Sequence, residues 1–183
     1  MYGVNSYTIS ASQGHSGRGA DEGQAVKAAL HHFRNVLAQA CLARMWAKVT
    51  GRSRRLLDLN TVRAASRVRG SRYAGTRAVP IAAIPGSEGR CQDFDAQFRP
   101  TGNRARSRWM SVATAWQMGK TLPPVDLVQV GDRYFVRDGH HRISVARALG
   151  QTAVDAEVTV LDVAGPLPWE RAANVGALAG QPA

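Results

Sequence analysis

Two adjacent histidines and an arginine, His140, His141 and Arg142, stand directly after Asp138 and Gly139. Imidazole changes its charge near neutral pH, so either histidine can act as a general acid or base. Guanidinium binds phosphate as a planar fork, and a carboxylate helps to hold a divalent ion. These residue types in this order indicate a site for phosphate or another anion.

The residues around this cluster predict a strand, a tight turn and a helix. Residues 134–136 are aromatic and β-branched, and Gly139 permits a backbone conformation that other residues avoid. Ile143, Ala146 and Leu149 then recur at helical spacing on one face. The unpaired N–H groups and the helix dipole favour an anion at the start of that helix.

A structural interpretation stands beside the functional one. Arg142 and Arg147 can be solvated charges on a helix face, and one of the histidines can be an ordinary packed imidazole. A zinc-type site is disfavoured because adjacent histidines point in different directions and no second His or Cys pair stands at ligand spacing. The concentration of donors at one turn favours the anion site.

Residues 134–146 resemble the signature of ParB-like and sulfiredoxin-like domains, especially small bacterial ParB-like proteins that share the Asp-Gly-His-His-Arg form. ParB proteins carry Gly-Glu-Arg-Arg here and sulfiredoxins carry Gly-Cys-His-Arg. The resemblance runs from about Val79 to Leu161. It implies a single α/β (α+β) domain with a small mixed sheet. It also implies a nucleoside triphosphate such as CTP or ATP, with its phosphates at the Gly139–Arg142 turn and Mg²⁺ near Asp138.

The same resemblance adds Arg90 as a phosphate-binding residue and raises an enzymatic alternative. In that alternative the protein is a metal-assisted nuclease or nucleotide hydrolase, with His140 or His141 as base or acid and Asp138 on the metal. It ranks below binding because two-metal nucleases need several carboxylates and the turn offers one. Sulfiredoxin activity is disfavoured, since His140 occupies the place of the essential cysteine.

The net charge of +11 is unevenly distributed along the chain. Residues 1–80 carry 13 Lys and Arg against 3 Asp and Glu, whereas residues 81–183 carry 11 against 10. This asymmetry predicts either a solubilising segment or a basic arm that binds DNA without sequence specificity. The arginines predicted to contact nucleic acid are Arg52, Arg54, Arg55, Arg63, Arg67 and Arg69.

Four segments follow from composition, periodicity and the resemblance. Residues 1–20 are expected to be disordered, and residues 21–78 to form a helical basic extension that packs on the domain or pairs with a second copy. The resemblance implies that residues 79–161 are the ParB/sulfiredoxin-like domain, and residues 162–183 are expected to be a loosely held tail. Within the extension, helices are predicted at 21–49 and 61–69, the first with an apolar face listed as Val26, Leu30, Phe33, Leu37, Cys41 and Met45.

Within the domain, strands are predicted at 125–130, 133–136 and 154–160, and a helix at 104–118 with Trp109 and Trp116 in the core. Residues 86–90 are predicted to form a flexible loop. The sequence lacks an apolar run of about 18 residues and an apolar signal core, and its two cysteines form no pattern. A cytoplasmic protein without a membrane partner is therefore expected.

Overall fold

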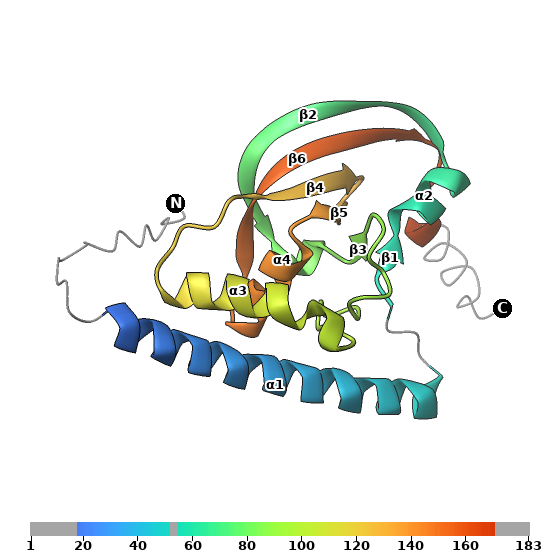
Figure 1. The fold of residues 1–183 in the computed structure, drawn as a ribbon. Coiled ribbons are helices and arrows are strands. Elements are labelled where there is room, and N and C mark those ends of the chain that lie inside the picture. The colour runs from blue at the N-terminus through green and yellow to red at the C-terminus, as the bar shows by residue number, and fades with distance from the viewer. Residues whose placement is uncertain (1–17, 52–54, 171–183) are drawn as a thin grey trace, which may run out of the picture.

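The computed structural model describes residues 18–51 and 55–170. They form one six-stranded mixed sheet with helices on it (Figure 1). The strands are β1 (Leu57–Asp58), β2 (Arg67–Pro80), β3 (Gly86–Ser87), β4 (Val125–Val130), β5 (Arg133–Asp138) and β6 (Ala153–Ala164). Their order in the sheet is β1-β3-β5-β4-β6-β2. The predicted α/β class with a small mixed sheet is thereby confirmed.

The sheet is mixed because the antiparallel hairpin of β4 and β5 has a parallel neighbour on each side. β4 and β5 are antiparallel and are joined at Gly131-Asp132, where Gly131 has a φ of 59°. β3 runs parallel to β5, and β4 runs parallel to β6. The two long strands β2 and β6 are antiparallel along their whole length and arch over one end of the sheet (Figure 1). β2 therefore forms one edge.

The helices are α1 (Arg18–Thr50), α2 (Leu59–Ala65), α3 (Arg106–Gln117) and α4 (His140–Ala148), with short 3-10 turns η1 (Ile81–Ala83) and η2 (Asn103–Ala105). Ile143 and Ala146 of α4 pack on one sheet face, in a core cluster with Leu127 and Val136. α2 belongs to a second cluster, in which its Val62 accompanies Phe135. α3 and then α1 lie outside α4 (Figure 1). The sheet is thus covered on both faces.

The N-terminal helix is present as predicted, but its buried face is different. The buried residues of α1 are Ala25, Ala29, Phe33, Val36, Ala40 and Ala43, whereas Val26 and Met45 are exposed. Phe33 packs against Trp109 of α3, with ring centroids 5.4 Å apart. Small alanines let α1 approach α3 closely, so the larger apolar residues at neighbouring positions are left outside. None of the described helices meets the length and hydropathy needed to cross a bilayer.

The helix predicted for residues 61–69 ends at Ala65, and Arg67–Pro80 is a strand instead. Pairing with β6 explains the difference, because Val68, Tyr73 and Val79 are strand-forming residues whose partners Val163, Thr159 and Val154 lie far away along the chain. The boundary expected near residue 79 therefore falls inside β2. The basic segment from Arg67 onward is part of the sheet.

Two further expectations are corrected by burial. Residues 86–90 do not begin as a flexible loop, because Gly86 and Ser87 are buried and pair with β5. Trp116 is 40% exposed, whereas Trp109 is fully buried and donates a 2.9 Å hydrogen bond from Nε1 to Ser144 Oγ. The strands predicted at 125–130, 133–136 and 154–160 are all confirmed, the last two with extensions.

Candidate functional site

The strand-to-helix turn forms as the sequence predicts. β5 ends at Asp138, Gly139 has a φ of 96°, and α4 begins at His140. A β-carbon at Gly139 would lie 2.6 Å from Cγ1 of Val125, so both the backbone conformation and the close approach of β4 require glycine. This turn brings the two histidines to the buried start of α4.

His140 faces the protein interior. Its Nε2 lies 2.6 Å from Oγ of Ser87 on β3, and its ring stacks on Phe94 at a centroid distance of 5.9 Å. Burial, and then the positive charge of Arg90, lowers the pKa of His140 to about 4. The imidazole is therefore neutral at pH 7 and links the start of α4 to β3.

His141 faces a cavity instead. Its ring meets Phe94 edge-on at 5.3 Å, and its Nδ1 is buried without a hydrogen-bond partner among the described residues. Burial, and then the charges of Arg90 and Arg108, lowers the pKa of His141. These two guanidinium groups therefore lie close enough to act electrostatically on the same imidazole.

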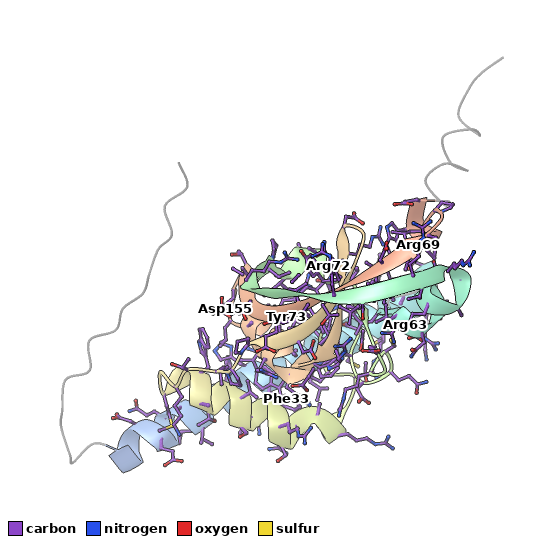
Figure 2. The ribbon with its side chains drawn as sticks, turned by 90° about the horizontal axis from the view of Figure 1, so that it is seen from above. Phe33, Arg63, Arg69, Arg72, Tyr73 and Asp155 are labelled. Carbon is purple, nitrogen blue, oxygen red and sulfur yellow. The ribbon has the colours of Figure 1, made fainter. Side chains whose placement is uncertain are left out.

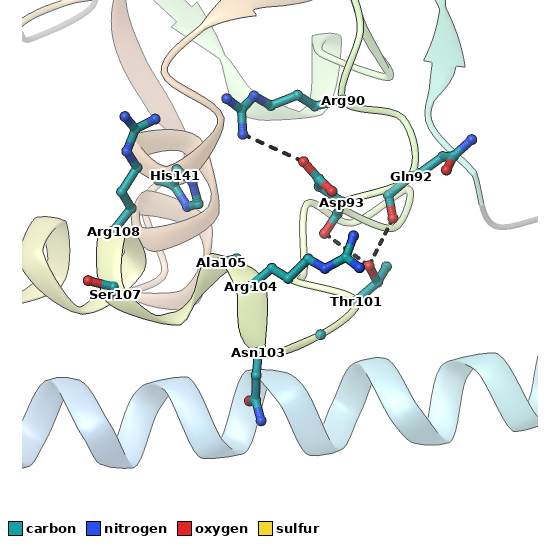
Figure 3. Close-up of a pocket in the computed structure, with 11 residues that line it drawn as sticks. Arg90, Gln92, Asp93, Thr101, Asn103, Arg104, Ala105, Ser107, Arg108 and His141 are labelled. Carbon is teal, nitrogen blue, oxygen red and sulfur yellow. Dashed lines mark hydrogen bonds and ion pairs between the residues drawn. The ribbon is translucent and has the colours of Figure 1, made fainter.

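The cavity beside His141 has a volume of about 750 Å³ and lies between α4, the start of α3 and the loop after β3 (Figure 3). Its cationic side chains are Arg90, Arg104 and Arg108, and its carboxylate is that of Asp93. Arg90 and Asp93 form an ion pair of 3.5 Å. The wall is completed by Gln92, Thr101, Gly102, Asn103, Ala105 and Ser107.

The backbone adds to this positive character. Gly102, Asn103, Arg104 and Ala105 line the cavity at the point where η2 leads into α3. Neither η2 nor α3 has a side chain that caps its N-terminus. Uncapped N–H groups and the helix dipole attract anions. Three guanidinium groups and a helix N-terminus thus surround one cavity with a single carboxylate.

Arg142 is directed away from this cavity. Its Nη1 donates to the carbonyl oxygens of Pro123 and Pro124 at 2.7 and 2.5 Å, and its Nη2 contacts Asp138 at 2.6 Å. It borders a separate hollow with Trp116 and Lys120. The protein itself therefore supplies acceptors for the guanidinium predicted to bind phosphate.

Asp138, predicted to hold a metal, is exposed and paired with Arg142. Among the described residues there is no group of three or more His, Cys, Asp or Glu side chains arranged to hold a metal ion. The thiol of Cys91 lies near the carbonyl oxygens of Leu57 and Ser87, and burial raises its pKa. A raised pKa disfavours the reactive thiolate.

The arginines predicted to contact nucleic acid lie on several elements. Arg52 and Arg54 fall outside the described residues. Arg55 is exposed before β1, and Arg63 of α2 pairs with Glu88. Arg67 and Arg69, by contrast, are exposed on the edge strand β2.

Of the predicted phosphate-binding residues, the structure brings His141 and Arg90 together in the cavity. Sequence reasoning did not identify Arg104 and Arg108 as their neighbours. The available signal was their spacing of four residues at the start of a predicted helix, which places both side chains on one face. Their proximity to His141 depends on how α3 packs against α4.

No family model matches the chain, and no curated protein matches it. Among solved structures, sulfiredoxin from Arabidopsis thaliana matches with 16% identity, covering 46% of this chain and 84% of that one. The TM-score of that match is 0.33.

Proposed function

We propose that the protein binds the polyphosphate of a nucleotide in the cavity bordered by Arg90, Arg104, Arg108 and His141. The observation that carries the proposal is the convergence of three guanidinium groups on a hollow whose wall holds one carboxylate. Arg104 and Arg108 have no ion-pair partner among the described residues. A ligand with several negative charges would supply those partners.

Each side chain has a distinct role in this proposal. Arg104 and Arg108 give charge-assisted hydrogen bonds to phosphate oxygens, each worth roughly 1.5–3 kcal/mol when desolvated. Arg90 exchanges its 3.5 Å pairing with Asp93 for the ligand. His141 accepts a proton as the anion enters and becomes a further donor.

Gly139, His140 and Arg142 hold the turn that presents His141. His140 connects α4 to Ser87, and Arg142 connects α4 to the carbonyl groups before β4. We therefore assign positioning roles to these three residues. Mg²⁺ would enter with the ligand, bound mainly to phosphate oxygens as is common for that ion.

Association with DNA remains the second element of the proposal. Arg67, Arg69 and Arg72 are exposed on the edge strand β2 and have no ion-pair partner among the described residues. Figure 2 shows Arg69 and Arg72 along this strand. Unpaired arginines along one edge suit a phosphate backbone. Triple replacement of these residues by glutamine should reduce both DNA affinity and its salt dependence. Unchanged DNA affinity would remove the β2 edge from the proposal.

Isothermal titration calorimetry with the full chain tests nucleotide binding. CTP, ATP, GTP and tripolyphosphate are each titrated with and without Mg²⁺. We expect tripolyphosphate and at least one nucleotide to bind with a Kd below millimolar. Absence of heat for all four ligands at millimolar concentration would overturn the proposal.

Phosphate release from the same nucleotides tests the hydrolase alternative, and nicking of a supercoiled plasmid tests the nuclease alternative. His141 is the histidine that reaches the cavity, so His141→Ala is the informative variant. Activity in the wild type and its loss in this variant would favour an enzyme. Equal background rates would leave binding alone.

A further inference from the structure

The C-terminal end of α1, from Leu42 to Thr50, carries four large apolar side chains that face solvent. Leu42 is 66% exposed, Met45 62%, Trp46 63% and Val49 80%. Their spacing of three and four residues places all four on one side of the helix. We call these four residues the α1 apolar stripe.

The stripe lies opposite the face by which α1 packs on the domain. In the same part of the helix, Ala40 and Ala43 are buried, with exposures of 0% and 8%. α1 is the outermost layer on its side of the molecule (Figure 1). None of the described elements covers the stripe, and its position on the outside makes it accessible to an extended surface.

The charged residues of α1 after Glu22 are all positive. Lys48 and Arg34 are exposed, have no ion-pair partner among the described residues, and lie almost four helical turns apart on the same side. Arg44 is also exposed, although its Nη1 reaches the carbonyl oxygen of Thr101. α1 contains no Asp or Glu after Glu22. A partner surface that complements the α1 apolar stripe and these cations must therefore be both apolar and negatively charged.

We propose that the α1 apolar stripe docks on an anionic lipid surface. Leu42, Met45, Trp46 and Val49 would enter the boundary between headgroups and acyl chains, where tryptophan is favoured. Lys48 and Arg34 would remain at the level of the anionic headgroups. Each nearby cation contributes about 1 kcal/mol of attraction to such a surface. This contact lies parallel to the membrane and is distinct from a membrane-spanning segment.

A second copy of the chain suits the stripe less well. Specific dimers bury roughly 800 Å² on each partner, which is more than four partly exposed side chains provide. The small size of the stripe, and the absence of Asp and Glu in α1 after Glu22, both favour an anionic lipid surface.

Flotation with vesicles tests the proposal on the full chain. Vesicles of pure phosphatidylcholine are compared with vesicles that contain phosphatidylserine at about one third of the lipid. The test variant is Trp46→Ser/Val49→Ser, and the control is Val26→Ser, which removes an exposed apolar side chain from α1 outside the stripe. Lys48→Gln tests the charge. Thermal melting checks that each variant is folded.

We expect the wild type and Val26→Ser to float with phosphatidylserine vesicles only. Trp46→Ser/Val49→Ser should lose at least tenfold in binding, and Lys48→Gln severalfold. Absence of wild-type flotation, or equal flotation of the stripe variant, would overturn the proposal. Sedimentation velocity supplies the remaining outcome: a wild-type dimer that Trp46→Ser/Val49→Ser converts to a monomer would assign the stripe to a second copy and overturn lipid docking.

Discussion

His141 and Arg142 are neighbours in the chain but border two different hollows. His141 lines the cavity that contains Arg90 and Arg108, whereas Arg142 points to the carbonyl groups of Pro123 and Pro124. Successive residues of a helix are about 100° apart around its axis, so both cannot face one ligand at the first turn. The Gly-His-His-Arg cluster is therefore divided between ligand contact and support of the turn.

The first prediction concerns Arg142. Arg142→Gln removes an ion pair with Asp138 and two hydrogen bonds from Nη1 to the carbonyl oxygens of Pro123 and Pro124, so it should lower the free energy of unfolding by roughly 1–3 kcal/mol. Urea unfolding measures this change. Arg142 does not line the cavity, so the affinity of the folded variant for tripolyphosphate should stay within about threefold of the wild type, a difference of less than about 1 kcal/mol in binding free energy. A stable variant with more than tenfold weaker binding would instead make Arg142 a direct phosphate contact.

The second prediction concerns Gly139. Gly139→Ala forces alanine to a φ near 96° and places its β-carbon 2.6 Å from Val125, so unfolding should become easier by at least about 2 kcal/mol. Gly150→Ala is a matched control, because Gly150 has a φ of 77° but no atom near the added carbon. The control isolates backbone strain. If both variants lose equal stability, the contact with Val125 contributes nothing.

The third prediction concerns the pH dependence of stability. His140 has a pKa of about 4 in the folded chain against about 6.5 when unfolded. Below pH 6.5 the unfolded state takes up a proton that the folded state does not, so stability is lost as the pH falls towards 4. The loss amounts to at most about 3 kcal/mol. It should be much smaller in His140→Gln. Parallel curves for the wild type and this variant would contradict this account.

These positions show how far sequence reasoning reaches. The turn at Gly139, the following helix and the β4–β5 hairpin depend on local signals: a glycine at a break, a helical apolar period and a short run of β-branched residues. They could be predicted. β2 could not, because its strand conformation depends on pairing with β6, which lies far away along the chain. When only residues close in the sequence are considered, Arg67 and Arg69 fit the short helix predicted for residues 61–69.

The residues of the candidate site also divide into those that local sequence signals identify and those that only tertiary packing reveals. His141 and Arg90 could be selected because they stand at a turn and in a loop with an evident chemical pattern. Arg104 and Arg108 look like solvated charges on a helix, and only the packing of α3 on α4 places them beside His141. The buried face of α1 was misjudged for a related reason. Large apolar residues suggested the core, whereas close helix packing selected alanines.

The fourth prediction concerns His141 and protons. Burial and two arginines lower its pKa in the empty cavity, and a bound anion should raise it again. Binding should then take up protons, and affinity should increase as the pH falls towards the ordinary histidine range near 6.5. Calorimetry in two buffers of different ionisation enthalpy measures the uptake. His141→Gln corrects for titration of the phosphate itself, and equal uptake by both proteins would exclude a role for His141.

The fifth prediction tests the central claim, that Arg104 and Arg108 make the cavity a polyphosphate site. Tripolyphosphate is titrated into the wild type, Arg104→Gln/Arg108→Gln and the control Arg106→Gln, which removes an exposed charge of α3 outside the cavity. We predict that the double variant binds at least a hundredfold more weakly, since two contacts of roughly 1.5–3 kcal/mol are lost. Arg106→Gln should stay within threefold of the wild type. Equal weakening of the two variants, or no weakening in either, would contradict the proposed site.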